Sequence, residues 1–515
     1  MDMAQNSRQG DGEKRGAVEQ VTVVGEQVMD GDVDVGIVQD WSPKEEVKAR
    51  QKIDFILLPI VGLAFFALQL DRGNISTALT STITEDLGIN TNMINVGTQL
   101  LSAGIVLLEI PSNVILQRMG PQLWLSGQIL AWGSVATFQA FIHNRAGYLI
   151  TRLLLGLLEA GFIPGSLYFL STWYRKSETS LRVTCFFLGQ MLSSATSSLI
   201  GAGILTMSGK HGLAGWQWLF LIEGIITIFI GFIFILFLPP TVGNGYPLIS
   251  RGKWSYFTPR ESHIMINRVL VDDPAKARGG IRITGGNILD TVKQPRIWVH
   301  VLITMTSVIS IQGLSTYTPS IVKSFGYGTI QANALASVGY YGCVVLTMCL
   351  AFLSDRTYRR GPFVLVSITW QLITYACLRT ILYRVSKWHR YAILMLANVP
   401  NSAIHVLNIG WLSVNCKTAQ QRSVAMAMIV MAANTGGIAG SQVFRTEDAP
   451  KYLRAFTAIV ALAASGWVIT ALQIGQYIWS NRRIEKHVGE EQESIGEEEK
   501  GEPVEEGKRV WKWAW

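Results

Sequence analysis

The sequence predicts an all-α membrane protein in which twelve transmembrane helices form two six-helix bundles. Hydrophobic residues make up 49% of the 515 residues and charged residues only 16%, whereas soluble domains carry roughly 25% charge. Apolar runs long enough to cross a bilayer recur along the chain, and one long polar stretch near the middle separates six of them from six. With a mean hydropathy of +0.29, the chain is expected to lie mainly in lipid.

Each predicted span is an apolar run that can cross a hydrocarbon core of about 30 Å, which takes roughly 20 helical residues. The first half of the chain supplies six such runs and the second half supplies six more. They cover residues 53–76, 94–113, 123–142, 147–173, 183–206, 217–238, 297–318, 331–353, 362–382, 391–412, 421–444 and 455–479.

The spans divide the chain into five parts. Six helices on either side of a central polar stretch are typical of folds built from two repeated halves. Residues 1–40 and 487–507 have few large apolar side chains, so burial cannot offset the entropy of ordering them, and we expect both to be disordered. The predicted parts are a disordered cytoplasmic N-terminal tail at 1–50, a first bundle at 51–238, a cytoplasmic central loop at 239–295, a second bundle at 296–480 and a cytoplasmic C-terminal tail at 481–515.

The predicted orientation follows from lysine and arginine, which gather in the cytoplasmic loops of membrane proteins. With both termini inside, the inner flanks and the central loop hold most of these residues. Arg384, Lys387 and Arg390 lie together in an outer loop and run against this bias. The larger inner count still predicts that both termini are cytoplasmic.

Composition and motifs exclude several other classes of protein. The net charge is +8, but the basic residues are scattered between apolar runs and form no continuous patch, so no nucleic-acid partner is expected. The five cysteines show no CxxC spacing, which argues against disulfides and a metal site. Paired-histidine, nucleophile-elbow and phosphate-cradling motifs are missing from the sequence. We therefore predict a protein that is not an enzyme and uses no cofactor.

Four ionisable residues stand out inside the predicted spans: Asp71, Arg72, Arg152 and Glu159. An ionisable group at membrane depth costs roughly 2.5–3.5 kcal/mol on insertion scales, so each is a candidate functional residue. The direction of the chain places Asp71, Arg72 and Arg152 in the outer half of the membrane. Glu159 follows Arg152 by about two helical turns, so it is expected on the same face and nearer the centre.

These charges suggest a way to couple an anion to a proton. Two acids and two bases from two helices can neutralise one another while the site is empty. A carboxylate that binds Arg72 or Arg152 weakens the hold of that arginine on Asp71 or Glu159, and the acid then binds a proton more tightly. The alternatives are a permanent structural ion pair between the helices, and a location of Asp71 and Arg72 at the water interface.

Neutral polar side chains lie at comparable positions in other predicted spans. They are candidates to line a substrate site, although polar side chains also join membrane helices by hydrogen bonds. The histidine among them belongs to the residue type that titrates near neutral pH. The set comprises Gln69, Gln190, Gln312, Tyr317, His405 and Asn434.

Glycines on two predicted spans permit close approach of helix backbones, and Pro164 is expected to kink the fourth span. Ordinary tight packing is the alternative to a gating hinge. The glycines are Gly156, Gly161 and Gly165 on the fourth span and Gly436, Gly437 and Gly440 on the eleventh.

The loop after the eighth span, residues 354–362, reads SDRTYRRGP. It resembles the Asp-Arg plus basic motif that transporters of the major facilitator superfamily place on their cytoplasmic face, and this resemblance implies the major facilitator fold. The corresponding first-half segment, residues 113–122, has Gln117 where the acid is expected. The resemblance implies a cytoplasmic gate formed by Asp355, Arg356 and Arg118.

Four further segments resemble the anion:cation symporter family in its fungal allantoate-permease-like branch. They read LDRGNI at 70–75, RLLLGLLEAG at 152–161, GWQWLFLIEG at 215–224 and DAPKY at 448–452. The resemblance covers roughly residues 50–480. Substrates of similar symporters are small organic anions such as allantoate, nicotinate, pantothenate and biotin.

That resemblance also implies roles for individual residues. Arg72 is expected to meet the substrate carboxylate, while Asp71 and Glu159 are expected to serve proton coupling. Polar groups at three further positions are expected to line the cavity. These are Gln69, Gln190 and Asn434.

The leading hypothesis is a monomeric, proton-coupled symporter of the plasma membrane that imports a small organic anion by alternating access. Its partners are the anion, the proton and the lipid bilayer. The alternatives are an exporter of an acidic metabolite on the same fold, and a nutrient sensor that signals through its tails. The expected substrate-binding residues are Arg72, Gln69, Arg152, Gln190, Tyr317, His405 and Asn434, and the expected proton-coupling residues are Asp71 and Glu159.

Overall fold

The structure is a computed structural model that describes residues 40–242, 244–272, 284–357 and 359–498. Helices make up the regular structure of these ranges, apart from one isolated bridge between Thr241 and Asn244. The first half contains α1 (Pro43–Ala78), α2 (Ile83–Asp86), α3 (Thr91–Met119), α4 (Pro121–Phe138), η1 (Gln139–Phe141), α5 (Arg145–Glu159), α6 (Phe162–Trp173), α7 (Lys176–Leu205), η2 (Lys210–Gly212) and α8 (Gly215–Phe237).

The central stretch and the second half follow in chain order. The central stretch folds into short helices, and the second half returns to long apolar ones. The elements are η3 (Leu248–Ser250), α9 (Pro259–Asp272), α10 (Gly285–Val292), α11 (Pro295–Ser324), α12 (Thr329–Thr357), α13 (Gly361–Thr380), η5 (Leu382–Arg384), α14 (Lys387–Asn398), α15 (Asn401–Val414), α16 (Ala419–Gly440), η6 (Thr446–Asp448) and α17 (Leu453–Glu498).

In the described ranges, 11 helical segments are long and apolar enough to cross a membrane. The run expected at 123–142 corresponds to α4, which has 18 residues and continues into η1. It contains the polar residues Gln122, Ser126 and Gln128 and is not among those 11 segments. It lies along α8 and completes the first six helices. The predicted all-α fold with two six-helix bundles is confirmed.

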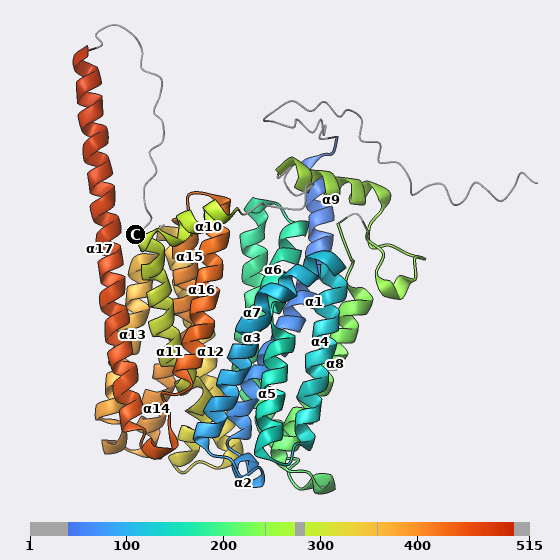
Figure 1. Ribbon diagram of the computed structural model, residues 1–515, viewed down its shortest axis with the longest axis vertical. Helices are drawn as coiled ribbons and strands as arrows, with labels where there is room; N and C mark the ends of the chain where they lie inside the picture. The colour runs from blue at the N-terminus through green and yellow to red at the C-terminus, as the bar shows by residue number, and fades with distance from the viewer. Residues whose placement is uncertain (1–39, 243, 273–283, 358, 499–515) are drawn as a thin grey trace, which may run out of the picture. The chain divides into compact units, whose positions relative to one another are not determined.

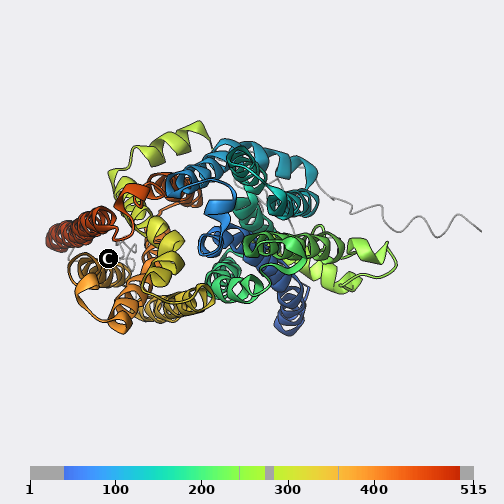
Figure 2. The ribbon, with the colours of Figure 1, turned by 90° about the horizontal axis from the view of Figure 1, so that it is seen from below.

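The two bundles lie side by side. Seen along the helices, α1 to α8 form one group and α11 to α17 form the other (Figure 2). The start of α1, the helices α9 and α10 and the far end of α17 lie at one end of the bundles, which we call the tail end (Figure 1). The short helix α2 lies at the opposite end, which we call the α2 end.

The first helix begins earlier than the sequence predicts. Its N-cap is Ser42, whose side chain accepts a hydrogen bond from the Glu45 backbone, while the Glu45 carboxylate bonds back to Ser42. This capping box and Pro43 in the first turn are strong helix-start signals. Residues 43–50, expected to belong to a disordered tail, are therefore helical, and the part of that tail at 1–39 lies outside the described residues.

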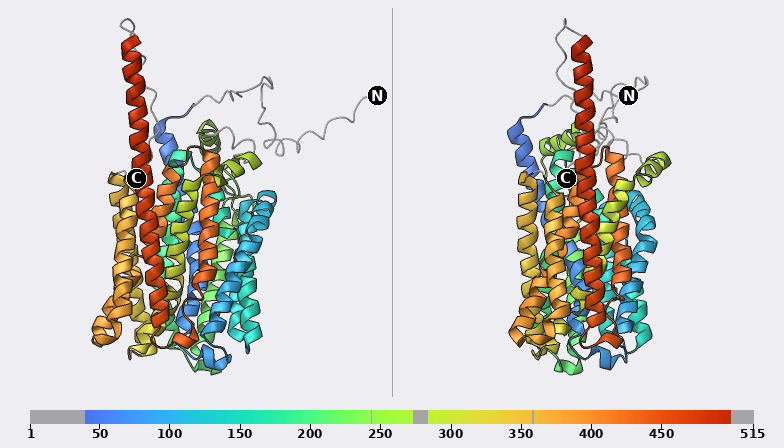
Figure 3. Two further views of the ribbon diagram at one scale, coloured as in Figure 1. Left: turned by 60° about the vertical axis from the view of Figure 1, so that its left-hand side comes forward. Right: turned by 90° about the vertical axis from the view of Figure 1, so that its left-hand side faces the viewer.

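The last helix also runs further than the sequence predicts. Disorder was expected over residues 487–507, but α17 continues through Glu498 (Figure 3). Its extension at 487–498 contains five Glu and one Gln, residue types that have high helix propensity. Residues 499–515, with the remainder of the predicted tail, lie outside the described ranges.

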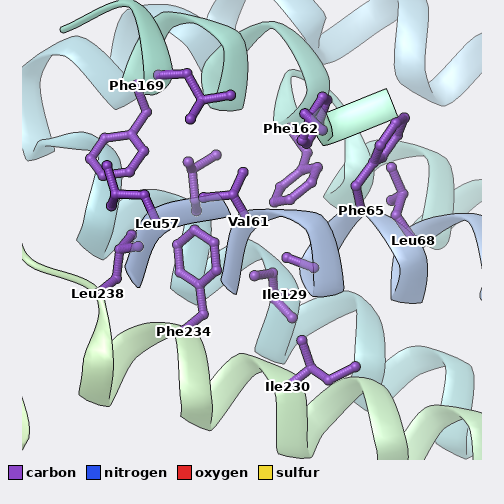
Figure 4. Packing of buried hydrophobic residues seen from close by; sticks show 14 of the residues in the cluster. Leu57, Val61, Phe65, Leu68, Ile129, Phe162, Phe169, Ile230, Phe234 and Leu238 are labelled. Atoms are coloured by element: carbon purple, nitrogen blue, oxygen red, sulfur yellow. The ribbon is translucent and has the colours of Figure 1, made fainter. Parts of the chain in front are cut away.

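The core of the first bundle is a continuous apolar cluster. Leu57, Val61 and Phe65 project from one face of α1, at the spacing that places side chains on a single helix face. They meet Phe162 and Phe234 from the neighbouring helices α6 and α8 (Figure 4). This packing holds α1 at the centre of the bundle, so its polar residues further along have a fixed position.

An ion-pair cluster fixes α9 against the first bundle at the tail end. Arg268 of α9 is fully buried and lies 3.1 Å from Glu178, at the start of α7, and 3.6 Å from Glu46 of α1. Arg50 also pairs with Glu178, at 3.0 Å. Burial raises the pKa of Glu178, but the charge of Arg268 and hydrogen bonds from Arg50 and Arg268 outweigh burial and hold the pKa below its usual value. This part of the expected central loop is therefore structured.

Hydrogen bonds that join the two halves gather at the α2 end. Asn95 of α3 donates to the backbone oxygen of Phe444 at 2.7 Å and accepts from the Tyr317 hydroxyl at 2.6 Å. Thr80, just after α1, accepts from Lys323 through its backbone oxygen at 2.6 Å and from Asn333 through its hydroxyl at 2.7 Å. These contacts close the α2 end in this structure.

Candidate functional site

The fourth span is interrupted where its buried acid lies. Helix α5 ends at Glu159, Gly161 has a left-handed backbone with φ of +80°, and α6 starts at Phe162. The interruption frees backbone carbonyls at membrane depth, where each needs a hydrogen-bond donor. The amide of Gln128 on α4 supplies it, donating to the oxygens of Leu158 at 3.0 Å and Ala160 at 2.7 Å.

Gly161 is required at this interruption for two reasons. Its positive φ is a backbone conformation that residues other than glycine adopt only at a cost in free energy. A Cβ atom at this position would also lie 2.5 Å from the Ser112 hydroxyl. The kink that was expected from Pro164 is instead a break at Gly161. Pro164 lies in the first turn of α6, where a missing N–H is tolerated.

The break holds an ion pair between α1 and α5. The Nε of Arg72 donates to Oε2 of Glu159 at 2.6 Å, a short charge-assisted bond. The Glu159 side chain is fully buried, while 24% of the Arg72 side chain is exposed. No described residue bonds to the second carboxylate oxygen of Glu159. A ligand can therefore approach the arginine while the acid stays away from water.

Asp71 points to a different neighbour. It is 1% exposed, and its Oδ2 accepts a hydrogen bond from Thr227 of α8 at 2.9 Å. Its Oδ1 has no partner among the described residues. The expected set of two acids and two bases is thus only partly assembled, because the ion pair joins Arg72 to Glu159 and leaves Asp71 on the α8 side of α1.

Arg152 is a buried cation with spare donors. It is 2% exposed, and its guanidinium lies over the rings of Tyr148 at 5.5 Å and Phe220 at 5.9 Å. Aromatic faces attract a cation, but they do not satisfy N–H groups. Its Nε and Nη2 find no hydrogen-bond acceptor among the described residues. Arg152 therefore keeps two unused donors in a buried position.

Sequence reasoning gave no role to Glu223, although the residue stands within the segment 215–224. Glu223 is fully buried in the middle of α8, and neither of its carboxylate oxygens has a partner in the described ranges. Asn74 of α1 has a buried, unpartnered Oδ1 as well. The signal was available, because an acid inside an apolar run meets the same criterion that selected Asp71 and Glu159.

Most of the neutral candidates are half-buried and available. The side chains of Gln69, Gln190, Asn434 and His405 make no hydrogen bond to another described residue, and Nδ1 of His405 is buried without a partner. Gln312 is half-buried in the same way. Their polar groups remain free for a ligand.

Tyr317 differs from these neutral candidates. It is 3% exposed, and its hydroxyl bonds to Asn95 across the two halves. In this structure Tyr317 belongs to the contact that closes the α2 end.

The expected gate residues lie at the tail end. Asp355, in the last turn of α12, pairs at 2.8 Å with Arg360, which precedes α13. Arg118 and Arg356 are exposed, and neither has an ion-pair partner among the described residues. This structure does not bring the three gate residues together.

The second half contains a break at the corresponding position. Helix α14 ends at Asn398 and α15 begins at Asn401, with Pro400 between them. Asn401 donates to the Asn398 side chain at 3.2 Å, and Asn398 donates to Thr318 at 3.1 Å. Interrupted helices at matching positions of two repeated halves mark the binding region in many secondary transporters.

The sequence is similar to known transporters over most of its length. It is 30% identical over 461 residues to an uncharacterized transporter of Saccharomyces cerevisiae, covering 87% of this chain and 84% of that protein. It is 29% identical over 333 residues to a protein of Agrobacterium vitis provisionally named a tartrate transporter, covering 65% of this chain and 69% of that protein.

The fold is shared with solved transporters at low sequence identity. A D-xylose-proton symporter superposes with a TM-score of 0.62 at 12% identity, covering 81% of this chain and 97% of that one. The xylose transporter XylE from E. coli, in a partially occluded inward-open conformation, gives 0.60 at 14% identity, covering 80% and 97%. The family model of the Major Facilitator Superfamily matches residues 61–441. This multi-pass membrane protein therefore belongs to the major facilitator superfamily.

Proposed function

We propose that the protein is a monomeric, proton-coupled symporter that imports a small organic anion, a carboxylate, across the plasma membrane. The single observation that carries the proposal is the 2.6 Å pair between a partly exposed Arg72 and a fully buried Glu159. The buried acid and an incoming anion can both bind this arginine. Binding of the anion is therefore linked to binding of a proton by the acid.

The coupling follows from competition for the guanidinium. A substrate carboxylate that takes the Arg72 donors leaves Glu159 buried without its cation. A buried carboxylate without a counter-charge is strongly disfavoured, so Glu159 takes up a proton. Loss of the proton restores the ion pair and expels the anion, because Glu159 then competes for Arg72 again.

The surroundings of the pair support an anionic substrate. Arg152 supplies a second buried cation with two unused donors. Gln69, Gln190 and Asn434 offer neutral groups that can orient the rest of the ligand. The similarity to a protein provisionally named a tartrate transporter is consistent with a carboxylate.

We propose the orientation of the protein in the membrane from the charge bias of the loops, which places the tail end in the cytoplasm. The contacts of Asn95 and Thr80 close the α2 end, so this structure corresponds to an inward-facing state. Alternating access then requires those contacts to break while the two bundles rock around the site.

The test starts with a thermal-shift screen of purified protein against small carboxylates at acidic and neutral pH, because a ligand that binds only the folded state stabilises it. A carboxylate that stabilises the protein is then measured in proteoliposomes. We expect an inward proton gradient to drive its accumulation, and Glu159→Gln to remove the response to the gradient.

Arg72→Ala is expected to abolish uptake, with Arg145→Ala as the matched control, because Arg145 is exposed at the start of α5. Uptake that ignores the gradient in the wild-type protein would refute the coupling. Normal uptake by Arg72→Ala would remove this residue from the site.

A further inference from the structure

We propose that Glu223 is a second proton-binding residue of the transport cycle, and that it shares a proton with Asp71 across the contact between α8 and α1. This inference rests on the proposed proton-coupled function and extends its proton site from α5 to α8.

The geometry of α1 and α8 places the two acids in one buried region. Thr227 of α8 donates to Asp71 at 2.9 Å, and Glu223 precedes Thr227 by one helical turn, so both lie on the same face of α8. Both Glu223 oxygens and Oδ1 of Asp71 are buried and unpartnered among the described residues. Two carboxyl groups with three unused oxygens therefore face one contact between helices.

The neighbouring elements offer Glu223 no cation of its own. Helix α4, which lies along α8, contains no acidic or basic residue. The part of α7 at 183–205 contains none either. From α1 the Asp71 and Asn74 side chains face Glu223, and Arg152 of α5 lies over the Phe220 ring, one turn away on α8.

A charge count indicates one bound proton in this state. Three fully buried acids, Asp71, Glu159 and Glu223, share this region with two bases, Arg72 and Arg152, and the half-buried Glu109 of α3 is a further acid that interacts with Arg72. Arg72 neutralises Glu159, and Arg152 can offset one further negative charge. The remaining carboxyl group must be neutral, because two neighbouring carboxylates in a low-dielectric region do not both ionise.

The shared proton gives Asp71 and Glu223 a role in the transport cycle. A proton that leaves Asp71 can be accepted by an oxygen of Glu223, with no change in the total charge of the pair. When one carboxyl of the pair loses its proton, the charge beside Arg152 changes, and so does the attraction of that arginine for an anion. Glu223 thus acts on the substrate through Asp71 and Arg152 and is a positioning residue.

The decisive variant is Glu223→Gln, which has the shape of the protonated acid and cannot release a proton. The probe is the carboxylate that stabilises the purified protein, in radiolabelled form. Exchange of labelled for unlabelled anion across the liposome membrane requires no net proton movement and is expected to fall less than gradient-driven accumulation. Accumulation driven by a proton gradient is expected to fall by about tenfold, because one proton-binding group is lost, a change equivalent to one pKa unit. The pH profile of accumulation is expected to become flatter.

Two further variants keep the test decisive. Glu223→Asp retains a carboxyl group and is expected to restore gradient-driven accumulation, with a displaced pH profile. Thr137→Val changes a different contact of α8, the one with α4, since Thr137 adjoins Gly224 next to Glu223. It removes no carboxyl group, and it is expected to leave the pH profile unchanged.

The outcomes separate this inference from the proposed function. If wild-type accumulation ignores the proton gradient, the proposed function fails. If the wild-type protein responds and Glu223→Gln accumulates anion with the same pH profile, Glu223 is a permanently protonated structural group and this inference alone is overturned. Loss of both exchange and accumulation in a folded Glu223→Gln protein overturns it too, as does failure of Glu223→Asp to restore coupling.

Discussion

The fourth and tenth spans are both interrupted, but side chains of different chemistry fill the two interruptions. The break between α5 and α6 is joined to α1 by the charged pair of Glu159 and Arg72. The break between α14 and α15 is filled by the neutral amides of Asn398 and Asn401. The interrupted helix of the first half therefore carries titratable side chains, and the interrupted helix of the second half carries uncharged ones.

The difference extends through both halves. Helices α11 to α16 carry their Asp, Glu, Lys and Arg side chains in their end turns, whereas the first half buries Asp71, Arg152, Glu159 and Glu223. An amide network has one low-energy arrangement, but an ion pair can be broken by a competing anion or a proton. The first half thus contains the charged groups at membrane depth, and the second half presents neutral polar groups there.

The largest expected effect that tests this comparison is on stability. Arg72→Ala leaves Glu159 buried and unpaired, which should cost about 3–5 kcal/mol of unfolding free energy at neutral pH. Adding Glu159→Gln to Arg72→Ala should recover most of that loss, because the uncompensated charge is gone. Thermal unfolding of the purified variants measures both changes.

Arg145→Ala is the control for this measurement and should stay within about 0.5 kcal/mol of the wild type. An Arg72→Ala protein as stable as the wild type would show that the pair of Arg72 and Glu159 does not contribute to the free energy of unfolding. The proposed difference between the two helix breaks would then be wrong.

The second half offers a buried histidine as the corresponding test. His300 is fully buried between the Asn408 side chain at 2.7 Å and the Tyr477 hydroxyl at 3.0 Å. His300→Ala removes the hydrogen bonds to the Asn408 side chain and the Tyr477 hydroxyl together with the buried ring, and it should cost about 3 kcal/mol in stability. Uptake per folded molecule and its pH profile should be unchanged.

His389, an exposed histidine of the same half, is the matched control, and His389→Ala should change neither quantity. A changed pH profile in His300→Ala would place titratable chemistry in the second half and break the comparison.

The first half also contains charges that are structural, and pH distinguishes them from the pair at the break. Glu178 has a lowered pKa, so its contribution to stability is present above the unfolded-state pKa and is lost as pH falls through the folded-state value. Glu178→Gln should cost about 2 kcal/mol at neutral pH, reduced by the partial exposure of its partners.

The stability difference between wild type and Glu178→Gln should shrink as the pH falls below the unfolded-state pKa and vanish once it is below the lowered folded-state pKa. Thermal unfolding as a function of pH measures it. A difference that is constant down to strongly acidic pH would mean that packing, and not ionisation, makes Glu178 important.

The spans and the acidic residues at membrane depth could be predicted from the sequence, because a charge in an apolar run is conspicuous. The partners could not be predicted, since they depend on how helices rotate about their axes. Arg72 and Asp71 are adjacent in the chain, yet one faces Glu159 and the other faces Thr227. The break at Gly161 was assigned to Pro164 for a similar reason, because the close approach of Ser112 is visible only in three dimensions.

The smallest expected effect concerns the contact between the halves at the α2 end. Thr80→Val keeps the side-chain shape but removes the acceptor of Asn333, which retains a bond to the Thr329 oxygen at 2.9 Å. Loss of one hydrogen bond destabilises the closed state by about 1 kcal/mol, so conformations open at the α2 end should become about fivefold more populated.

Labelling of a cysteine at Ser337 can measure this shift. Ser337 is 3% exposed and lies one turn from Asn333 on α12. In a protein whose five native cysteines are replaced by serine, Ser337→Cys should react with an impermeant maleimide faster when Thr80→Val is present. Thr82→Val removes a hydroxyl that bonds only to Asp86 within its own half and should leave the rate unchanged. Equal rates in all three proteins would mean that Thr80 does not hold the halves together, and closure would then rest on Asn95 and Tyr317.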